Sequence, residues 1–419
     1  MYFSIKLSIL SFIYNIGIRL LQLGLTILAP FNHKIKLGVA GRSQTYNKLQ
    51  TQILKSDKCL WFHCASLGEY EQGLPVFKEV RKEFNTHKIV LTFFSPSGYQ
   101  IRKDTPIADV VCYLPLDTTN HAKRFLDIVK PELTLFVKYD IWPNFLNELK
   151  ERNHRAILIS ALFRPNQIYF KPFGRYMRSK LFGFEHIFTQ DEASKNLLNK
   201  INYIQTTVSG DTRFDRVFSQ LDQDNTVDFI ENFNNHSICV VAGSTWPEDE
   251  RILATYINEA PPNQKFIVAP HNIKPNQIQK FRQQLKKKST LFSEQNHQDL
   301  KNSVVLIVDT IGILSKIYSY ADIAYVGGAL GTTGLHNTLE PAVFGVPIII
   351  GNNYNKFPEA KIMIEQGSMF SIKNSNELQL IMSKLTSNKE FLKASGEKNA
   401  NFIKKNTGAV IQIMNYIRI

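Results

Sequence analysis

Short apolar runs rich in β-forming residues alternate with stretches of helical period along most of this 419-residue chain. The runs lie at residues 88–94, 109–116, 132–139 and 155–162 in the first half, and at 237–244, 265–271, 303–309, 322–328 and 346–351 in the second. The segments between them, such as 120–130, mix polar and apolar residues at helical spacing. Because strands that alternate with helices form parallel sheets covered on both faces, the alternation predicts an α/β protein.

The two series of strands, together with the length of the chain, predict two domains. A chain of 419 residues is longer than the length at which single hydrophobic cores usually stop growing and chains divide into domains. We expect two doubly wound, Rossmann-like domains that face a cleft, one at residues 33–207 and one at 208–419. The last helical region, near 388–419, is a candidate to pack back on the first domain.

The first 32 residues differ from the rest because they are mainly apolar and carry few charges. Residues 1–30 carry only Lys6 and Arg19 as charges, and no small-residue cleavage site of a secretory signal follows them. A spanning helix needs about 20 apolar residues, and Arg19 interrupts this run. A spanning helix, an in-plane anchor and a helix packed on its own protein all remain open. The basic residues that follow indicate a membrane anchor on a cytoplasmic face: Lys34, Lys36, Arg42 and Lys48.

The charge balance indicates an anionic partner. Lysine and arginine number 50 against 36 acids, for a formal charge of +14. Nucleic acid, a phosphorylated substrate and an acidic membrane surface all fit this excess. Residues 163–184 interleave basic and aromatic side chains, which suits phosphates at a membrane interface, RNA, or simply a solvated basic helix. The four cysteines form no CxxC pair and are expected to be buried free thiols.

Two acidic residues in the first half follow strand-like runs. The stretch LWFHCASLGEYEQG predicts a buried strand that ends in a tight turn, with Glu69 just after the turn. Open α/β sheets bind ligands at such strand ends, so Glu69 is a candidate catalytic group. The alternative is that Glu69 only caps the next helix. Asp140, close to Lys138, occupies the end of another strand.

Three strand ends in the second half have the features of one nucleotide pocket. Gly243, Ser244 and Thr245 end a strand and precede a helix start, where backbone N–H groups can approach a phosphate. Residues 308–328 form a strand, a glycine turn, a helix and a further strand. Asn337 and Glu340 resemble a helix cap with its reciprocal acid, and the Glu340 carboxylate could accept hydrogen bonds from ribose hydroxyls.

Several motifs of cofactor and metal sites are missing from the sequence. It has no G-x-G-x-x-G after the first strand and no P-loop, which argues against a dinucleotide oxidoreductase and a P-loop ATPase. It also has no HExxH and no DxD pair, so we expect no cofactor and no metal.

Six motifs in order resemble those of the 3-deoxy-D-manno-octulosonic acid (Kdo) transferases of Gram-negative bacteria. They are WFHCASLGE, IWPN, GDTRFD, GST, VDTIG and HNTLEPAVFGVPIIIG. The resemblance covers nearly the whole chain, including its hydrophobic start. It implies a GT-B glycosyltransferase at the cytoplasmic face of the cell inner membrane. Such an enzyme moves Kdo from CMP-Kdo to the lipid A precursor lipid IVA, in lipopolysaccharide biosynthesis, with inversion and without a metal.

The resemblance also assigns residues. It implies that Glu69 is the general base and that Asp140 and Arg213 support the transition state. The CMP-binding residues that it implies, with the Gly-Ser-Thr turn above, are Gly243, Ser244, Thr245, Pro270, His271, Ile311, Gly312, Ile313, Asn337, Thr338, Leu339 and Glu340. The sequence departs from the family pattern at four positions: His271 and Leu162 replace arginines, Ile313 replaces a glutamate and Lys138 replaces an acid.

Two alternatives remain open. One is a GT-B transferase or epimerase that uses a UDP-sugar. The other is a basic, membrane-associated protein that binds nucleic acid or lipid without catalysis. The family resemblance favours the Kdo transferase and predicts no nucleic-acid partner.

Overall fold

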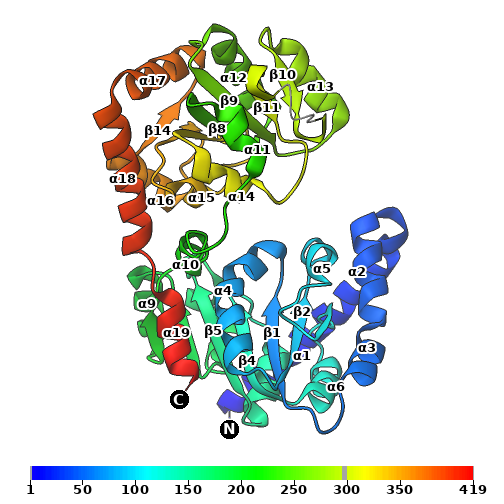
Figure 1. Cartoon of the computed structure of the whole chain (residues 1–419). Helices are drawn as coiled ribbons and strands as arrows, with labels where there is room; N and C mark the ends of the chain where they lie inside the picture. Colours follow the sequence, from blue (N-terminus) through cyan, green and yellow to red (C-terminus); the bar gives the residue numbers. More distant parts are fainter. Residues whose placement is uncertain (1, 295–299, 419) are drawn as a thin grey trace. The chain divides into compact units, whose positions relative to one another are not determined.

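The computed structural model describes residues 2–294 and 300–418. In the first helix, the side chains are described from Ile9 onward. The chain divides into two compact units, which are described separately. Unit 1 consists of Met1–Arg216 with Thr407–Ile419, and unit 2 consists of Val217–Asn406 (Figure 1). The division follows Arg216, whereas the sequence pattern suggested a boundary after residue 207.

Unit 1 contains a seven-stranded parallel sheet in the order β3-β2-β1-β4-β5-β6-β7. The strands are β1 (Cys59–Cys64), β2 (Lys88–Phe93), β3 (Val110–Tyr113), β4 (Pro131–Val137), β5 (Arg155–Ala161), β6 (His186–Thr189) and β7 (Thr206–Val208). The chain order reverses between β1 and β4. Ligands of doubly wound folds bind at the carboxyl ends of the strands beside such a reversal.

Both faces of this sheet are covered, as the continuous apolar strands require. All six residues of β1 are buried, and its side chains alternate between two core clusters. Trp61 packs against α6 (Thr119–Val129) and α7 (Pro143–Glu151), whereas Phe62 packs against α4 (Leu67–Glu83). The rings of Phe62 and Phe77 stack with centroids 4.4 Å apart.

The helix α19 (Ala409–Ile417) packs on α4 and completes unit 1. Ile413, Met414 and Ile417 are buried in the same cluster as Phe62. The backbone N–H of Gly408, just before this helix, donates to Asp215 Oδ1 at 2.9 Å. The preceding helix α18 (Lys389–Lys405) belongs to unit 2.

Unit 2 repeats the architecture with a seven-stranded parallel sheet in the order β10-β11-β9-β8-β12-β13-β14. The strands are β8 (Ile238–Thr245), β9 (Gln264–Pro270), β10 (Ser289–Leu291), β11 (Val305–Ile307), β12 (Ile323–Val326), β13 (Ile348–Gly351) and β14 (Met369–Ile372). Its order reverses between β8 and β12. Helices α12 (Pro247–Glu259) and α17 (Ser375–Ser387) bury apolar side chains against this sheet.

The expected α/β fold with two doubly wound sheets is confirmed. Each strand-like segment named from the sequence forms a strand in one of the sheets. Four further strands, β6, β7, β10 and β14, have only three or four residues each. The sequence around these four has no long apolar run of the kind that marks β3, β11, β12 and β13, which are equally short.

The chain begins with α1 (Tyr2–Leu28), followed by η1 (Ala29–Phe31), α2 (His33–Ser43) and α3 (Thr45–Gln52). Among the described residues, Ile9–Phe31 is the one stretch long and apolar enough to cross a membrane by length and composition. None of its most apolar window is buried inside the protein. Its exposed side chains are weak evidence of membrane association.

Candidate active site

Glu69 occupies the first turn of α4, directly after β1 at the strand reversal of unit 1. Its Oε2 accepts hydrogen bonds from the backbone N–H of Ser66 at 2.7 Å and from Ser66 Oγ at 3.0 Å. These bonds close a capping box, so the residue does cap its helix. In the described part of the chain no hydrogen bond reaches Oε1. The cap therefore fixes the carboxyl group through one oxygen and leaves the other available.

Asp140 follows β4, the neighbour of β1, and lies close to Glu69. Its Oδ2 accepts the backbone N–H of Ala65 at 2.8 Å, which ties the ends of the two strands together. Burial, and then the negative charge of Glu69, raise the pKa of Asp140 well above its usual value. A like charge nearby disfavours the ionised form, so Asp140 favours its protonated form.

His63 lies beneath this pair and is uncharged. Its Nε2 lies 3.6 Å from Asp140 Oδ2, and its Nδ1 is 2.8 Å from Thr92 Oγ1. Complete burial lowers the pKa of His63 to about 3, so the imidazole is neutral at pH 7. The contact between His63 and Asp140 is therefore not an ion pair. Sequence reasoning did not identify His63, although it stands inside the quoted WFHCASLGE motif.

Arg213 lies on α10 (Thr212–Phe218), and its guanidinium is oriented by Asp211. Asp211 Oδ2 accepts from Arg213 Nε at 2.8 Å and from Nη2 at 2.7 Å. Asp211 Oδ1 also accepts from Gln72 Nε2 at 2.9 Å, and Gln72 lies on α4 one turn after Glu69. The structure thus brings Glu69, Asp140 and Arg213 to the carboxyl edge of one sheet in unit 1. Asp211 and Gln72 were missed, although Asp211 is part of the GDTRFD motif.

Three of the described non-glycine residues with positive φ lie at or next to the carboxyl ends of strands. Lys138 directly follows β4 and has a φ of 72°. Ser160 and Ser244 are the penultimate residues of β5 and β8, with φ of 53° and 55°. Backbone conformations of this kind cost free energy and concentrate at functional sites. These three residues lie at the same sheet edges as the candidate residues, whereas others, such as Lys130 and Asn235, end helices.

In unit 2, residues Gly243–Thr245 form the end of β8, at the reversal between β8 and β12. A Cβ on Gly243 would come within 2.0 Å of Tyr318 Oη, so close packing explains this glycine. Thr245 is fully buried, and its hydroxyl donates to Glu250 Oε1 at 3.2 Å. Ser244 is the residue of this segment whose side chain is half-buried.

His271 follows Pro270 at the end of β9 and belongs to a stack of flat rings. Its ring lies 4.7 Å from that of Trp246 at an angle of 19°, and 4.4 Å from that of His336. Trp246 Nε1 donates to His336 Nε2 at 3.0 Å. Burial, and then His271, lower the pKa of His336 to about 4, so this imidazole is neutral at pH 7. Trp246 and His336 had no assigned role from sequence.

The segment Asn337–Glu340 differs slightly from the expected cap. The helix α15 begins at Leu339 with Thr338 as its N-cap, one residue later than the sequence suggested. Asn337 Oδ1 accepts the backbone N–H of Leu339 at 3.2 Å, and Asn337 Nδ2 donates to Glu340 Oε1 at 3.0 Å. Thr338 and Leu339 are buried, so Asn337 and Glu340 are the polar side chains available here.

The loop Ile311–Ile313 precedes α14 (Leu314–Ile317), on the same side of the sheet. Ile311 is 86% exposed and Gly312 has a φ of 97°. The loop therefore presents accessible backbone rather than a polar side chain. The candidate nucleotide segments follow β8, β9, β11 and β12, which are adjacent strands, and so they share one carboxyl edge.

Within residues 2–294 and 300–418, no group of three or more His, Cys, Asp or Glu side chains could hold a metal ion. The four cysteines are free and buried, as expected.

Solved structures of GT-B-like fold are similar to this chain over most of its length. UDP-GlcNAc 2-epimerase from Neisseria meningitidis matches with a TM-score of 0.58 at 14% identity, covering 86% of this chain and 100% of that one. MurG from Acinetobacter baumannii matches with a TM-score of 0.53 at 10% identity, covering 86% and 99%. The fold class is therefore GT-B.

Sequence comparisons identify the family within this class. The profile described as "3-Deoxy-D-manno-octulosonic-acid transferase (kdotransferase)" matches residues 38–216. A 3-deoxy-D-manno-octulosonic acid transferase of Aquifex aeolicus is 30% identical over 353 residues, which cover 82% of this chain and 90% of the relative. One of Haemophilus influenzae is 25% identical over 86% of both chains. The chain belongs to the family of Kdo transferases and is a glycosyltransferase.

A longer relative matches as well. The bifunctional glycosyltransferase/methyltransferase of Fusobacterium nucleatum is 26% identical over 382 residues. These residues cover 87% of this chain but only 57% of that protein.

Proposed function

We propose that this protein transfers Kdo from CMP-Kdo to the lipid A precursor lipid IVA, with inversion at the anomeric carbon. The observation that carries this proposal is the pair of carboxyl groups at the strand reversal of unit 1. One of them, Glu69, is held through Oε2 and keeps Oε1 free of protein hydrogen bonds in the described part of the chain. A purely binding protein has no need of such a pair.

Glu69 is proposed as the general base. A sugar hydroxyl has a pKa far above 7, so it attacks efficiently only when a base removes its proton during the attack. Because burial and a nearby carboxylate raise the pKa of Asp140, Asp140 favours its protonated form and is a poor candidate for the group that takes up the proton. In the proposed step, Oε1 takes the proton of the acceptor hydroxyl while the hydroxyl oxygen bonds to the anomeric carbon. The bond from that carbon to the CMP phosphate oxygen breaks, and CMP leaves with both electrons.

Arg213 and Asp140 are proposed to support the transition state. CMP departs as an anion, so positive charge stabilises its departure better than a proton donor does. The bidentate contact with Asp211 holds the Arg213 guanidinium in one orientation. Asp140, fixed by the Ala65 N–H, positions the turn that carries Glu69.

Unit 2 is proposed to bind CMP at its carboxyl edge, and unit 1 to bind the lipid acceptor. In this assignment, the proposed domain of residues 33–207 binds the acceptor, and the proposed domain of residues 208–419 binds the CMP-sugar donor. Glu340 would accept hydrogen bonds from the ribose, while the backbone of Ser244 and of Ile311–Ile313 would approach the phosphate or base. Residues 1–32 would hold the protein on the cytoplasmic face of the inner membrane, close to its lipid substrate.

Mass spectrometry of the reaction products tests the proposal. The protein is incubated with CMP-Kdo and lipid IVA, and the expected product is lipid IVA heavier by one or more Kdo units. A parallel incubation replaces CMP-Kdo with a UDP-sugar, because enzymes of the same fold are named for UDP-sugars. Transfer from the UDP-sugar but not from CMP-Kdo would overturn the proposal. An unfolding temperature of the protein that does not rise when CMP is added would overturn it as well.

A further inference from the structure

The helix α1 turns its polar side toward unit 1 and its apolar side away from it. The side chains that face the protein include Ser11, Tyr14 and Asn15, which are half-buried. The opposite side is a continuous apolar face of exposed residues: Ile9, Phe12, Ile13, Ile16, Leu20, Leu23 and Ile27. A helix that merely covers a soluble core has the reverse arrangement, with its apolar stripe inward.

A buried carboxylate holds the middle of α1 in place. Tyr14 Oη donates to Asp117 Oδ2 at 2.8 Å. Asp117 is fully buried and also accepts the backbone N–H groups of Asn144 at 3.1 Å and Phe145 at 3.0 Å. It therefore joins α1 to the first turn of α7. The ring of Tyr14 also contacts that of Tyr176, with centroids 5.8 Å apart.

Asn15 adds a second set of hydrogen bonds beside the first. Its Oδ1 accepts from the backbone N–H and from the hydroxyl of Thr119, both at 3.2 Å. Its amide also lies within hydrogen-bond distance of Asn144 Oδ1, at 3.4 Å. We call Tyr14, Asn15 and Asp117 the polar latch. It fixes the helix to unit 1 near the middle of its length.

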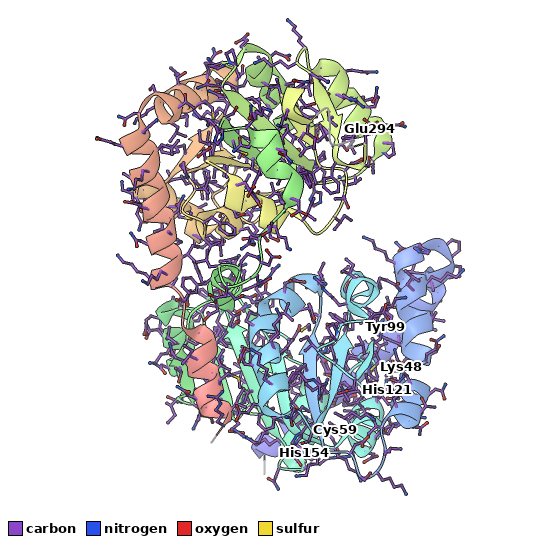
Figure 2. All side chains as sticks on the ribbon, viewed as in Figure 1. Lys48, Cys59, Tyr99, His121, His154 and Glu294 are labelled. Atoms are coloured by element: carbon purple, nitrogen blue, oxygen red, sulfur yellow. The ribbon has the colours of Figure 1, made fainter. Side chains whose placement is uncertain are left out.

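Basic side chains flank the apolar face. Arg19 lies on its border and lines a cavity of about 330 Å³ under the helix. A second cavity of about 350 Å³ lies farther along α1 and is lined by His121 and the exposed Arg124, among others; Figure 2 shows His121 in unit 1. Lys34 and Lys36 follow the helix and are exposed. This distribution of charge suits the phosphate groups of an anionic lipid surface.

We infer that α1 lies in the plane of an anionic membrane surface, with its apolar face among the acyl chains and its polar latch on unit 1. A free spanning helix would break the latch and place Tyr14, Asn15, Arg19 and Gln22 in hydrocarbon, where polar groups are costly. A helix that lies in the plane of the membrane keeps the hydrogen bonds of the polar latch. This inference refines the membrane placement in the proposed function, and its test requires no transferase activity.

Depth measurements distinguish the in-plane from the spanning position. A fluorophore is attached to the full-length variants Ile9→Cys, Ile16→Cys and Leu23→Cys, one at a time; the native cysteines are buried. The proteins are bound to vesicles of phosphatidylethanolamine and phosphatidylglycerol that contain lipids with quenchers at known depths. Positions 9 and 23 lie about 21 Å apart along the helix. An in-plane helix predicts equal, shallow depths at all three positions. A span of Ile9–Phe31 would place position 9 at a shallow depth and positions 16 and 23 deep, and this result would overturn the inference.

A matched pair of charge substitutions tests the surface itself. Leu20→Glu places a charge in the apolar face, and Leu380→Glu places the same charge at an exposed leucine of α17 in unit 2. Leu20→Glu should weaken sedimentation with the anionic vesicles by about tenfold or more, while Leu380→Glu should not change it. If Leu20→Glu instead converted a dimer into monomers and left vesicle binding intact, the apolar face would bind a second copy of the chain. The inference would then fail.

The latch has its own test. Tyr14→Phe with Asn15→Ala removes its hydrogen bonds and leaves the apolar face unchanged. This variant should still bind the vesicles, but a protease should cut it between α1 and α2 several times faster than the unaltered protein. Unchanged protection would show that the latch does not hold α1 on unit 1.

Discussion

Glu69 is at the same time the cap of its helix and the proposed base, and the two roles use different oxygens. Oε2 takes both bonds from Ser66, whereas Oε1 takes none from the described residues. The two readings that the sequence left open therefore do not compete. A cap that holds one oxygen orients the other, which is what a positioned base needs.

Replacing Glu69 with Gln should abolish most transfer and leave the fold intact. Gln also serves in a capping box, so the unfolding free energy should change by less than about 1 kcal/mol. A positioned general base contributes about 10²–10⁴-fold to the rate, so transfer should fall by at least the lower figure. The control is Glu377→Gln, because Glu377 occupies the corresponding first turn of α17 in unit 2. Near-normal transfer by a folded Glu69→Gln protein would exclude the base role.

Glu340→Ala should weaken the binding of CMP. A lost hydrogen bond to a charged group is worth about 1.5–3 kcal/mol, or roughly ten- to a hundredfold in affinity. Isothermal calorimetry with CMP measures this, and Glu365→Ala, at an exposed position on α16 (Pro358–Glu365), serves as the control. Equal affinities of the two variants would remove Glu340 from the proposed nucleotide site.

Glu250 should make the stability of unit 2 depend on pH. Burial raises its pKa from 4.5 to about 7, so the folded protein holds this proton more tightly than the unfolded chain does. Stability attributable to Glu250 is therefore greatest at low pH and falls as the pH rises from about 4.5 to 7. Glu250→Gln should be more stable than the unaltered protein at pH 8 by an amount of the order of 1–3 kcal/mol. Denaturant unfolding at pH 5 and pH 8 compares them, and a difference independent of pH would contradict the shift.

The sequence carried the candidate residues but not their surroundings. Glu69 and Arg213 could be named because short motifs contain them, and Asp140 because it directly precedes the IWPN motif. His63 and Asp211 stand in the same motifs and Trp246 directly follows the GST motif, yet their contacts depend on which segments become neighbours. A linear pattern does not specify such pairings. The shift of the α15 cap from Asn337 to Thr338 is a difference of local backbone geometry that residue types leave open.

At the scale of elements, α19 illustrates how one short helix completes a core. Ile413 is fully buried against α4, whereas Ile411 on the same helix is 65% exposed. Ile413→Ala should lower the unfolding free energy by about 2–5 kcal/mol, as for other large-to-small changes in cores. Ile411→Ala should change it by less than about 0.5 kcal/mol. Chemical denaturation measures both, and equal effects would mean that the helix does not dock on α4 in solution.

Strands were easier to predict than the position of α1. The runs at 88–94 and 132–139 are apolar and β-rich along their whole length, as buried parallel strands are. The composition of α1 fits a span, an in-plane anchor and a packed helix equally well. Only the contacts of Tyr14 and Asn15 with unit 1 reveal which side of the helix faces the protein.

At the scale of the whole molecule, the excess of 14 positive charges favours the binding of the proposed substrates, which are anionic. A leaving phosphate needs neutralising charge, which many enzymes supply with a divalent metal. Here Arg213 is proposed for that role, so transfer should survive dialysis against EDTA. Initial rates before and after chelation measure this. Loss of transfer that magnesium restores would show that a metal takes part.

Unit 1 is made from two stretches of chain that the whole of unit 2 separates. During synthesis, residues 407–419 emerge only after the 190 residues of Val217–Asn406. At about 5–20 residues per second this interval lasts roughly 10–40 seconds. Throughout it, the side of α4 that later receives Ile413, Met414 and Ile417 is uncovered on the nascent chain. The ribosome thus delivers the closing piece of unit 1 after unit 2 is complete, and an exposed apolar surface of this kind is where chaperones bind.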